Sequence, residues 1–530
     1  MKVEVWSLKE KVGQMFIIAF AGEEMTEELK QAIIEWNVGG VILFQRNLRD
    51  NNKVVKLNKQ IQALASEHNR PPLWISIDQE GGGISYLWEG MVLSPGNMII
   101  AATGEAQYAY DAAKVMGEQL IELGFTMNYA PNIDVNNNPA NPVIGARAFS
   151  DSPQEVSIFG KHAVSGYHDA GVIAVAKHFP GHGDTATDSH LGLPVVNKSL
   201  EELEQHELLP FKENIEEGLD AIMTAHIVFP AIDKKYPATL SKTILTDLLR
   251  ETYQFKGLII TDSMEMDAIA KFYGREEGTV KAIQAGADII LACGQDLTSQ
   301  SAMMERVIQA VFSGELDEAV VNVAVERILF YKDKWMRKEQ MGAHSSLAFK
   351  KQKEHYRKQM LEIAEAGVTL QRNERGLIPI LGHQKVKVIS QQTYNDENYM
   401  GDRRAIVEYV FNDGNYEVVY LEKEKPSLME MSKISESLEL NQTVLFLINE
   451  RRTLGEEWAM AYQKISEKTD NIIVVSLWNP QIVHHFPKET RVESYIATYS
   501  NTEEVIYALK SLIEGEKPFK GIAPVSLIHY

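Results

Sequence analysis

Eight short runs of apolar and β-branched residues recur through the first two thirds of the chain, and each ends in polar residues or glycine. The runs are MFIIAF (15–20), GGVILF (39–44), LWISID (73–78), FTMNYAPNIDV (125–135), GVIAVA (171–176), AIMTAHI (221–227), GLIITD (257–262) and ADIILA (287–292). Helix-like stretches such as EAQYAYDAAKVMGEQLIELG separate most of them. Strands alternating with helices in this number, over roughly 300 residues, predict a (β/α)8 TIM barrel with its functional side chains at the C-terminal ends of the strands.

A second alternating region follows. Its strand candidates are KVKVIS (385–390), YEVVYL (416–421), TVLFLIN (443–449), NIIVVSLW (471–478) and ESYIATYS (493–500). Helical segments such as GEEWAMAYQKIS intervene, which predicts a smaller α/β sandwich domain. We therefore expect a barrel domain over 1–337, a charged linker over 338–362 and a C-terminal α/β domain over 363–530. The second region contains no obvious cluster of catalytic side chains.

Composition limits the class of partner. The balance of 53 basic against 73 acidic residues gives a net charge of −20, which argues against nucleic acid or an anionic membrane. The single cysteine, Cys293, excludes an internal disulfide and a cysteine-based zinc site. No apolar stretch approaches the ~18 residues of a membrane span, and the first residues lack a signal-peptide pattern. We expect a cytoplasmic protein that uses no cofactor and no metal; these features do not predict its oligomeric state.

The stretch KHFPGHGDTATDSH (177–190) follows the apolar run GVIAVA and is predicted to be a loop at a strand end. Asp188 and His190 can place a carboxylate-backed histidine over a substrate, and Asp262 ends the strand GLIITD at the same face. This set fits covalent catalysis: Asp262 attacks, His190 protonates the leaving group and then activates water, and Asp188 orients the imidazole.

Plainer interpretations exist for each of these residues. Asp262 can cap the helix that follows it, His190 can be a loop histidine without a role, and Asp188 can be a turn former. A metal site built from His178, His182 and His190 is a further alternative, although no known ligand spacing supports it.

A second group of polar residues follows strands at the same rim. Its members are Asp78, Arg147, Lys177 and His178. Several donors and an acceptor around one rim suit a ligand with many hydroxyl groups, because each buried hydroxyl needs a partner. The alternative is that Lys177 only pairs with Asp134 or Asp78.

On these residues the chain resembles glycoside hydrolase family 3, in its β-N-acetylglucosaminidase branch and two-domain form. The motifs that carry the resemblance are IDQEGG (77–82), APNIDVNNNPANPVIGARAFS (130–150), KHFPGHGDTATDSH (177–190), MTAHIVFPAID (223–233), PATLSKTILTDLLRE (237–251) and ITDSMEM (260–266). Looser matches in VTLQRNERGLIPI (368–380) and EKPFKGIAPVSL (516–527) resemble the family's C-terminal domain.

The resemblance implies a retaining glycosidase. It implies Asp262 as the nucleophile, His190 as the acid/base and Asp188 as its helper. The sugar-binding residues that it implies are Asp78, Arg147, Lys177 and His178. The implied substrates are small glycosides with terminal β-linked N-acetylglucosamine, such as muropeptides or chitin fragments, hydrolysed by double displacement. Cell-wall recycling is the implied setting.

One departure from the family pattern bears on the substrate. After the D-Q-E-G-G motif, two arginines usually follow, but here the sequence reads Gly83, Ile84, Ser85 and Tyr86. Tyr86 offers a hydroxyl or a stacking face instead of a cationic fork. Two alternatives follow: an enzyme of the same mechanism that acts on another or a modified amino sugar, or one that uses phosphate as acceptor, because a histidine acid/base tolerates an anion. A catalytically silent sugar-binding protein is a third.

Overall fold

Eight parallel strands close into a barrel in the order β1-β10-β9-β8-β7-β6-β3-β2. The computed structural model describes residues 3–186, 188, 192–336, 346–382, 384–391, 406–451, 454–486 and 491–526. The barrel strands are β1 Phe16–Ile18, β2 Gly40–Ile42, β3 Trp74–Ile77, β6 Met127–Asn128, β7 Ile173–Phe179, β8 Ala221–Thr224, β9 Leu258–Ser263 and β10 Ile289–Ala292. Each lies within or overlaps one of the eight predicted runs, so the predicted TIM-barrel fold is confirmed.

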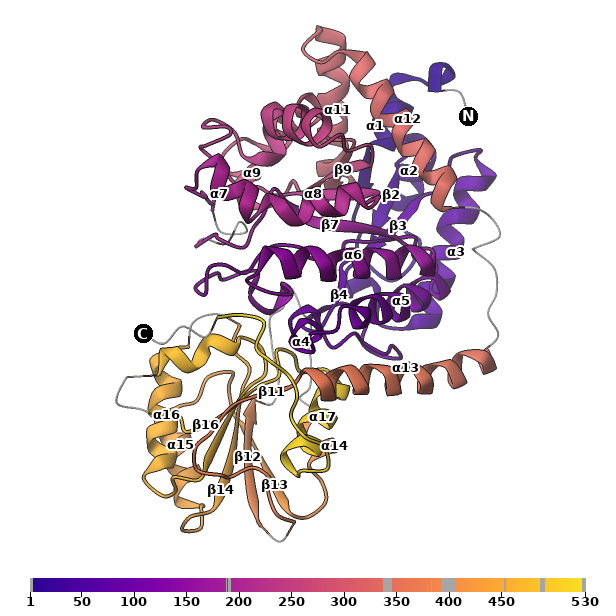
Figure 1. The fold of residues 1–530 in the computed structure, drawn as a ribbon. Coiled ribbons are helices and arrows are strands. Elements are labelled where there is room, and N and C mark those ends of the chain that lie inside the picture. Colours follow the sequence, from indigo (N-terminus) through magenta and orange to yellow (C-terminus); the bar gives the residue numbers. More distant parts are fainter. Residues whose placement is uncertain are drawn as a thin grey trace.

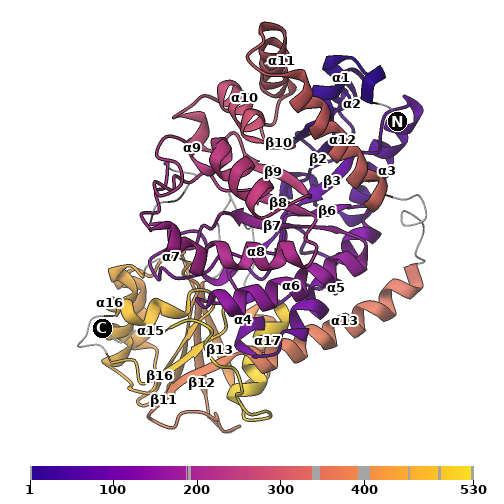
Figure 2. The ribbon, with the colours of Figure 1, turned by 45° about the horizontal axis from the view of Figure 1, so that its top comes forward.

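Helices surround the ring of strands (Figure 2). They are α1 Leu8–Gln14, α2 Glu27–Glu35, α3 Asn51–Glu67, α4 Asn97–Ala102, α5 Gln107–Glu122, α6 Pro153–Ala170, α7 Leu200–Gln205, α8 Leu208–Glu216, α9 Asp267–Ala270, α10 Arg275–Ala285, α11 Leu297–Ser313 and α12 Glu318–Trp335, with a further helical segment over Thr243–Thr252. Because helices cover the outside and side chains fill the inside, both faces of each strand are buried, which is why the strands are continuous apolar runs rather than alternating ones.

One boundary differs from the prediction. The strand β7 continues through Lys177 and His178 to Phe179, so the loop begins three residues later than its sequence indicated. After a register shift, Phe179 still pairs with Thr224 of β8, and Lys177 forms a bridge with Asn132. The two residues are therefore held by the barrel itself.

A short hairpin at the barrel mouth was not predicted. It consists of β4 Gln79–Gly81 and β5 Ile84–Ser85, which pair antiparallel directly after β3. The side chain of Gln79 crosses the hairpin, accepts from the N–H groups of Tyr86 (2.9 Å) and Leu87 (3.1 Å), and donates to the Leu87 carbonyl (2.9 Å). These bonds fix the base of the hairpin.

The C-terminal domain is a six-stranded sheet in the order β11-β16-β15-β14-β12-β13, in which only the β11–β16 pair is antiparallel. Its strands are β11 Thr369–Asn373, β12 Val386–Gln391, β13 Tyr416–Leu421, β14 Thr443–Ile448, β15 Ile472–Ser476 and β16 Ser494–Ala497. Its helices are α14 Val407–Val410, α15 Leu428–Glu436, α16 Glu456–Ser466 and α17 Glu503–Ile513. In β14, Leu445 and Leu447 face one core, whereas Val444, Phe446 and Ile448 face another, so the sheet is covered on both sides.

The two domains share a hydrophobic core. A long helix, α13 Ser346–Gly367, runs along their boundary (Figure 1). Barrel residues Ile84, Met98 and Ile99 belong to the same cluster as the inner face of the C-terminal sheet. The segment after α17 returns to the barrel, where Pro524 accepts hydrogen bonds from Ser150 Oγ (2.6 Å) and the Asp151 N–H (3.2 Å). The C-terminal domain is thus joined to the mouth side of the barrel.

Candidate active site

The predicted polar residues gather at the C-terminal ends of the barrel strands. Asp78 follows β3, Lys177 and His178 lie near the end of β7, and Asp262 lies near the end of β9. His226, which was not predicted as a site residue, follows β8 at the same rim. The electrostatic environments of Tyr129 and of Cys293, which follows β10, each include the charges of both Asp78 and Asp262. These two carboxylates therefore face one mouth, where a (β/α)8 barrel carries its reactive groups.

Asp262 is half-buried in β9 and accepts a hydrogen bond from the N–H of Ser263 at 2.7 Å. The alternative interpretation as a helix cap is wrong, because α9 begins at Asp267 and the residue before it is Met266. Next to Asp262, the carbonyl of Ser263 contacts His226 Nε2 at 2.9 Å. Since a carbonyl only accepts, Nε2 carries the hydrogen, and the imidazole clamps the strand end beside the carboxylate.

A buried chain of alternating charges connects Asp78 to Arg147. Lys177 Nζ lies 2.6 Å from Asp78 Oδ1 and 2.7 Å from Glu80 Oε1. Both oxygens of Glu80 are also bound by Arg147, through Nη2 at 2.7 Å and Nε at 3.0 Å. Glu80 was missed as a site residue, although it is the acidic residue of the D-Q-E-G-G motif and holds two predicted ones together.

The charges in this chain fix one another. Burial alone would raise the pKa of Glu80, but Arg147 and Lys177 hold it well below its ordinary value. Burial alone would lower the pKa of Lys177, yet Asp78 and Glu80 outweigh it and hold that pKa above its ordinary value. Lys177 thus stays cationic at the mouth, and it pairs with Asp78 and Glu80 rather than with Asp134.

His178 is oriented by Asp134. The carboxylate accepts from His178 Nδ1 at 2.7 Å and from the His178 N–H at 3.0 Å. Because Nδ1 carries the hydrogen toward Asp134, Nε2 is the nitrogen that a substrate hydroxyl can meet. His178 is 5% exposed and Asp134 is fully buried.

The first part of the loop after β7 is anchored to the segment after β6. The N–H of His182 donates to Asp134 at 2.7 Å, and Asn141 Nδ2 donates to the carbonyls of His182 and Gly183, both at 2.9 Å. A Cβ at Gly183 would lie 1.6 Å from the Val135 carbonyl oxygen, so this close approach requires glycine. Burial lowers the pKa of His182 to about 4, which keeps its ring neutral near pH 7.

The end of this loop that carries the predicted catalytic pair is described only in part. Asp188 is buried, at 5% exposure, and its carbonyl accepts from the Gly192 N–H at 3.1 Å. His190, the predicted acid/base, lies outside the described residues. Among the residues that the structure describes, no three His, Cys, Asp or Glu side chains are placed to hold a metal ion.

The departure from the family pattern has a structural reason at Gly83. A Cβ on this residue would lie 1.5 and 1.6 Å from two ring carbons of Trp478, which belongs to the C-terminal domain. No side chain fits there, so the first of the two usual arginines is excluded by sterics.

At the position of the second arginine, Tyr86 packs edge-on against Phe44, with ring centroids 5.8 Å apart. The Arg46 guanidinium, from the loop after β2, lies 4.6 Å from the Phe44 ring centroid, and its Nε donates to the Phe20 carbonyl at 3.2 Å. Burial lowers the pKa of Arg46, and an ionised Cys293 or Tyr86 would oppose this shift, so both groups lie within reach of its charge. A cation from the loop after β2 thus lies near Tyr86, and sequence reasoning missed it.

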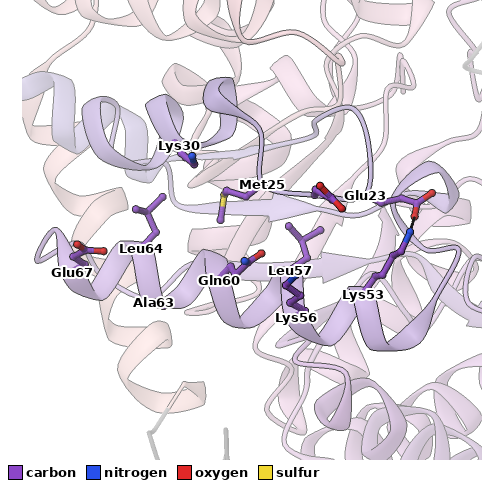
Figure 3. A pocket seen from close by; sticks show the side chains of 11 residues that line it. Glu23, Met25, Lys30, Lys53, Lys56, Leu57, Gln60, Ala63, Leu64 and Glu67 are labelled. Carbon is purple, nitrogen blue, oxygen red and sulfur yellow. Dashed lines mark hydrogen bonds and ion pairs between the residues drawn. The ribbon is translucent and has the colours of Figure 1, made fainter.

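A hollow of about 520 Å³ lies elsewhere, between α2 and α3 on the outer wall of the barrel (Figure 3). Two of its lysines pair with glutamates: Lys53 with Glu23 at 3.0 Å and Lys30 with Glu27 at 2.6 Å. The hollow lies away from the C-terminal ends of the barrel strands, so it is not the candidate site. No helix in the described ranges is long and apolar enough to cross a membrane.

Comparison with known proteins agrees with this geometry. Residues 7–330 match the family model described as the glycosyl hydrolase family 3 N terminal domain. A solved glycoside hydrolase family 3 β-N-acetylglucosaminidase from Paenibacillus sp. str. FPU-7 is similar over 99% of both chains, with 36% identity and a TM-score of 0.92.

Two bacterial relatives are similar over shorter lengths. β-Hexosaminidase A of Pseudoalteromonas piscicida is 34% identical over 383 residues, which are 68% of this chain and 63% of that protein. A β-hexosaminidase of Shewanella frigidimarina is 37% identical over 276 residues, which are 51% of this chain and 78% of that protein. The chain therefore spans less than two thirds of the length of the first of these relatives.

Proposed function

Because the chain belongs to glycosyl hydrolase family 3, as its motifs predicted, we propose that it is a retaining β-N-acetylglucosaminidase. Its substrates are small glycosides with a terminal β-linked N-acetylglucosamine, such as muropeptide or chitooligosaccharide fragments. The similarity over 99% of both chains to a β-N-acetylglucosaminidase supports this choice of sugar. The enzyme cleaves by double displacement through a glycosyl–enzyme intermediate.

The single observation that carries the proposal is the grouping of Asp262 with the Asp78–Lys177–Glu80–Arg147 chain at one barrel mouth. A carboxylate nucleophile needs a sugar presented at a fixed angle, and a rigid, charged set of hydroxyl-binding groups supplies that. Lys177, Arg147 and His178 are donors, and Asp78 is an acceptor, for hydroxyl and acetamido groups.

Asp262 attacks the anomeric carbon, and the bond to the leaving-group oxygen breaks as that oxygen takes a proton from His190. His190 then removes a proton from water, which displaces Asp262 and releases the sugar with its original configuration. Asp188 orients the His190 ring and stabilises its cationic form. A histidine suits this role beside Asp262, because the imidazole is cationic before proton transfer and neutral after it, and in neither form does it repel the nucleophile as a second carboxylate would.

The test is a panel of 4-nitrophenyl glycosides with wild-type protein, Asp262→Ala and His190→Ala. We expect release of nitrophenol from the β-N-acetylglucosaminide and a loss on the order of 10⁴-fold in kcat for Asp262→Ala. In His190→Ala, a better leaving group such as dinitrophenol should restore part of the first step, because it needs little protonation. A 5-fluoro glycosyl donor should label Asp262 covalently.

Two results would contradict the proposal. No nitrophenol from the N-acetylglucosaminide, with turnover of another glycoside, would show that the sugar is a different one. An equal loss in His190→Ala with every leaving group would remove the acid role. Running the panel with phosphate covers the phosphorylase alternative, in which a glycosyl phosphate would accumulate in place of free sugar.

A further inference from the structure

The β4–β5 hairpin, which directly follows Asp78 and contains Glu80, has its tip against the C-terminal domain. Asp78 precedes β4 and Glu80 lies within it; Gly81 ends β4, and Gly82 and Gly83 form the turn. The Gly82 N–H donates to the Ser94 carbonyl at 2.9 Å, and a Cβ on Gly82 would lie 3.1 Å from the Gly96 Cα. The tip is thus packed backbone against backbone on the barrel side.

On the side of the C-terminal domain, the hairpin tip packs against the ring of Trp478. This residue is 3% exposed and follows β15, in a segment held by Leu477 N–H to the Ile448 carbonyl (2.8 Å) and Asn479 N–H to the Glu450 carbonyl (3.2 Å). The Trp478 ring occupies the space of a Gly83 side chain, with ring carbons 1.5, 1.6 and 2.7 Å from the ideal Cβ position. It therefore cannot shift toward the hairpin, and the hairpin cannot move toward it.

The Trp478 ring lies close to the linked charges of Glu80 and Arg147. One cavity of about 10 Å³ is lined by Glu80, Arg147, Trp478 and Tyr499, together with Gly81, Gly82, Gly83, Gly96, Asn97 and Ala146. Arg451 links the same two domains by a second contact. Its guanidinium lies 5.7 Å from the Trp478 ring centroid, and its Nη2 donates to the Val143 carbonyl at 3.5 Å. Arg147 Nη1 donates to that same carbonyl at 3.3 Å.

We propose that Trp478 of the C-terminal domain is a positioning residue for the sugar site. By packing on Gly83 it holds the β4–β5 hairpin in the register that presents Asp78 to the substrate and Glu80 to Lys177 and Arg147. The C-terminal domain thus contributes to catalysis without touching the reacting atoms. This inference rests on the proposed function.

The variants Trp478→Phe and Trp478→Ala test it, because both remove the ring carbons that contact Gly83. We expect kcat/KM for the N-acetylglucosaminide to fall on the order of 10- to 100-fold in Trp478→Ala, mostly through KM, and less in Trp478→Phe. The matched control is Trp458→Phe. Trp458 is fully buried in the same domain, packs on Phe446 at 5.7 Å and faces the other side of the sheet. The Trp458→Phe variant should be less stable than the wild type, with an unchanged KM.

The effect of Gly83→Ala on KM should change sign when Trp478 is removed, and this change distinguishes a positioning role of Trp478 from a role in stability alone. The φ of Gly83 is not in the left-handed region, and the three atoms nearest to a methyl group at this position are all carbons of the Trp478 ring. In the wild-type background Gly83→Ala should raise KM, whereas in the Trp478→Ala background the methyl group fills vacated space and should lower KM toward the wild-type value. Additive effects of the two substitutions would overturn the inference.

Hydrogen–deuterium exchange of the peptide over residues 79–87 gives a readout that does not depend on activity. The inference predicts faster exchange in Trp478→Ala and not in Trp458→Phe. If the wild type cleaves no glycoside, the proposed function fails while this measurement still decides the inference. Unchanged exchange in Trp478→Ala overturns it whatever the activity.

Discussion

The carboxylate of Asp134 accepts two hydrogen bonds from His178, one from the backbone N–H at 3.0 Å and one from Nδ1 at 2.7 Å. The same group accepts from the His182 N–H at 2.7 Å and from Asn132 Nδ2 at 2.9 Å. Burial alone would raise the pKa of Asp134, but the two histidines and these donors hold it below its ordinary value. One ionised carboxylate therefore sets both the ring of His178 and the start of the loop that leads to Asp188.

Asp134→Asn should reduce kcat/KM for the N-acetylglucosaminide about 100-fold, equivalent to roughly 2.7 kcal/mol of transition-state stabilisation. Asparagine offers one acceptor oxygen, and its amide hydrogens would face N–H groups, so the His178 ring loses its fixed orientation. Steady-state kinetics with a thermal unfolding curve for each protein would measure this.

The control for this substitution is Asp288→Asn. Asp288 is 1% exposed, pairs with Arg250 at 2.5 Å and lies before β10, at the opposite end of the barrel. Its loss should lower Tm while KM stays unchanged. An equal fall in kcat/KM in both variants would mean that Asp134 acts only through stability.

The barrel could be predicted because each of its strands has a signal in its own short stretch of sequence. A strand buried on both faces must be apolar throughout, and its end must turn polar where the mouth begins. The elements that were missed lack this signal. The β4–β5 hairpin has three glycines and a charged residue in QEGGGIS, and β11 is a mostly half-buried edge strand that pairs antiparallel with β16.

The candidate site could be predicted where a reactive residue stands at a strand end, as Asp78 and Asp262 do. Sequence reasoning did not find Glu80, the orienting role of Asp134 or the packing of Trp478 on the hairpin tip. Each of these depends on a contact between segments far apart in the chain, and such a contact leaves no periodicity in the sequence. The absence of arginine at Gly83 was visible, but its cause, a tryptophan ring of another domain, was not.

Glu80→Gln should raise KM by about 10- to 100-fold and should lower kcat by less than that. Lys177 would keep only Asp78 as a carboxylate partner, and Arg147 would lose the two bonds to Glu80, so the positive charge beside the bound sugar would be less well balanced. Asp220→Asn is the matched control: its carboxylate is 5% exposed and pairs with Lys334 at 2.5 Å, before β8. If KM is the same in wild type and Glu80→Gln, Glu80 does not organise the site.

Arg46→Met should raise KM for the N-acetylglucosaminide about tenfold, equivalent to roughly 1.4 kcal/mol, close to the low end for a hydrogen bond to a charged group. The reason is that Arg46 is the cation near Tyr86, where the usual second arginine is absent. Arg49→Met is the control, since Arg49 is on the same loop but its side chain is 77% exposed. Equal KM values in the two variants would exclude Arg46 from the sugar site.

A buried lysine lies at the opposite end of the barrel. Lys332 on α12 is 3% exposed, and its Nζ donates to Gln14 Oε1 at 2.9 Å and to the Gly39 carbonyl at 2.8 Å. No carboxylate pairs with it in the described part of the chain, and burial lowers its pKa to about 7 from an ordinary value of 10.5.

This shift predicts a stability that rises with pH. Between about pH 7 and 10.5 the unfolded chain keeps a proton on Lys332 that the folded chain releases, so unfolding takes up a proton. The free energy of unfolding should therefore rise by up to about 1.4 kcal/mol per pH unit from this one group, and the gain should vanish below about pH 7. In Lys332→Met the two acceptors lose their donor at every pH. The variant should therefore be destabilised by the same amount at every pH, and its free energy of unfolding should lack the rise with pH that Lys332 causes. The measurement is the difference in unfolding free energy between wild type and variant from pH 6.5 to 9. A difference that does not change with pH would show that Lys332 keeps its proton in the folded protein.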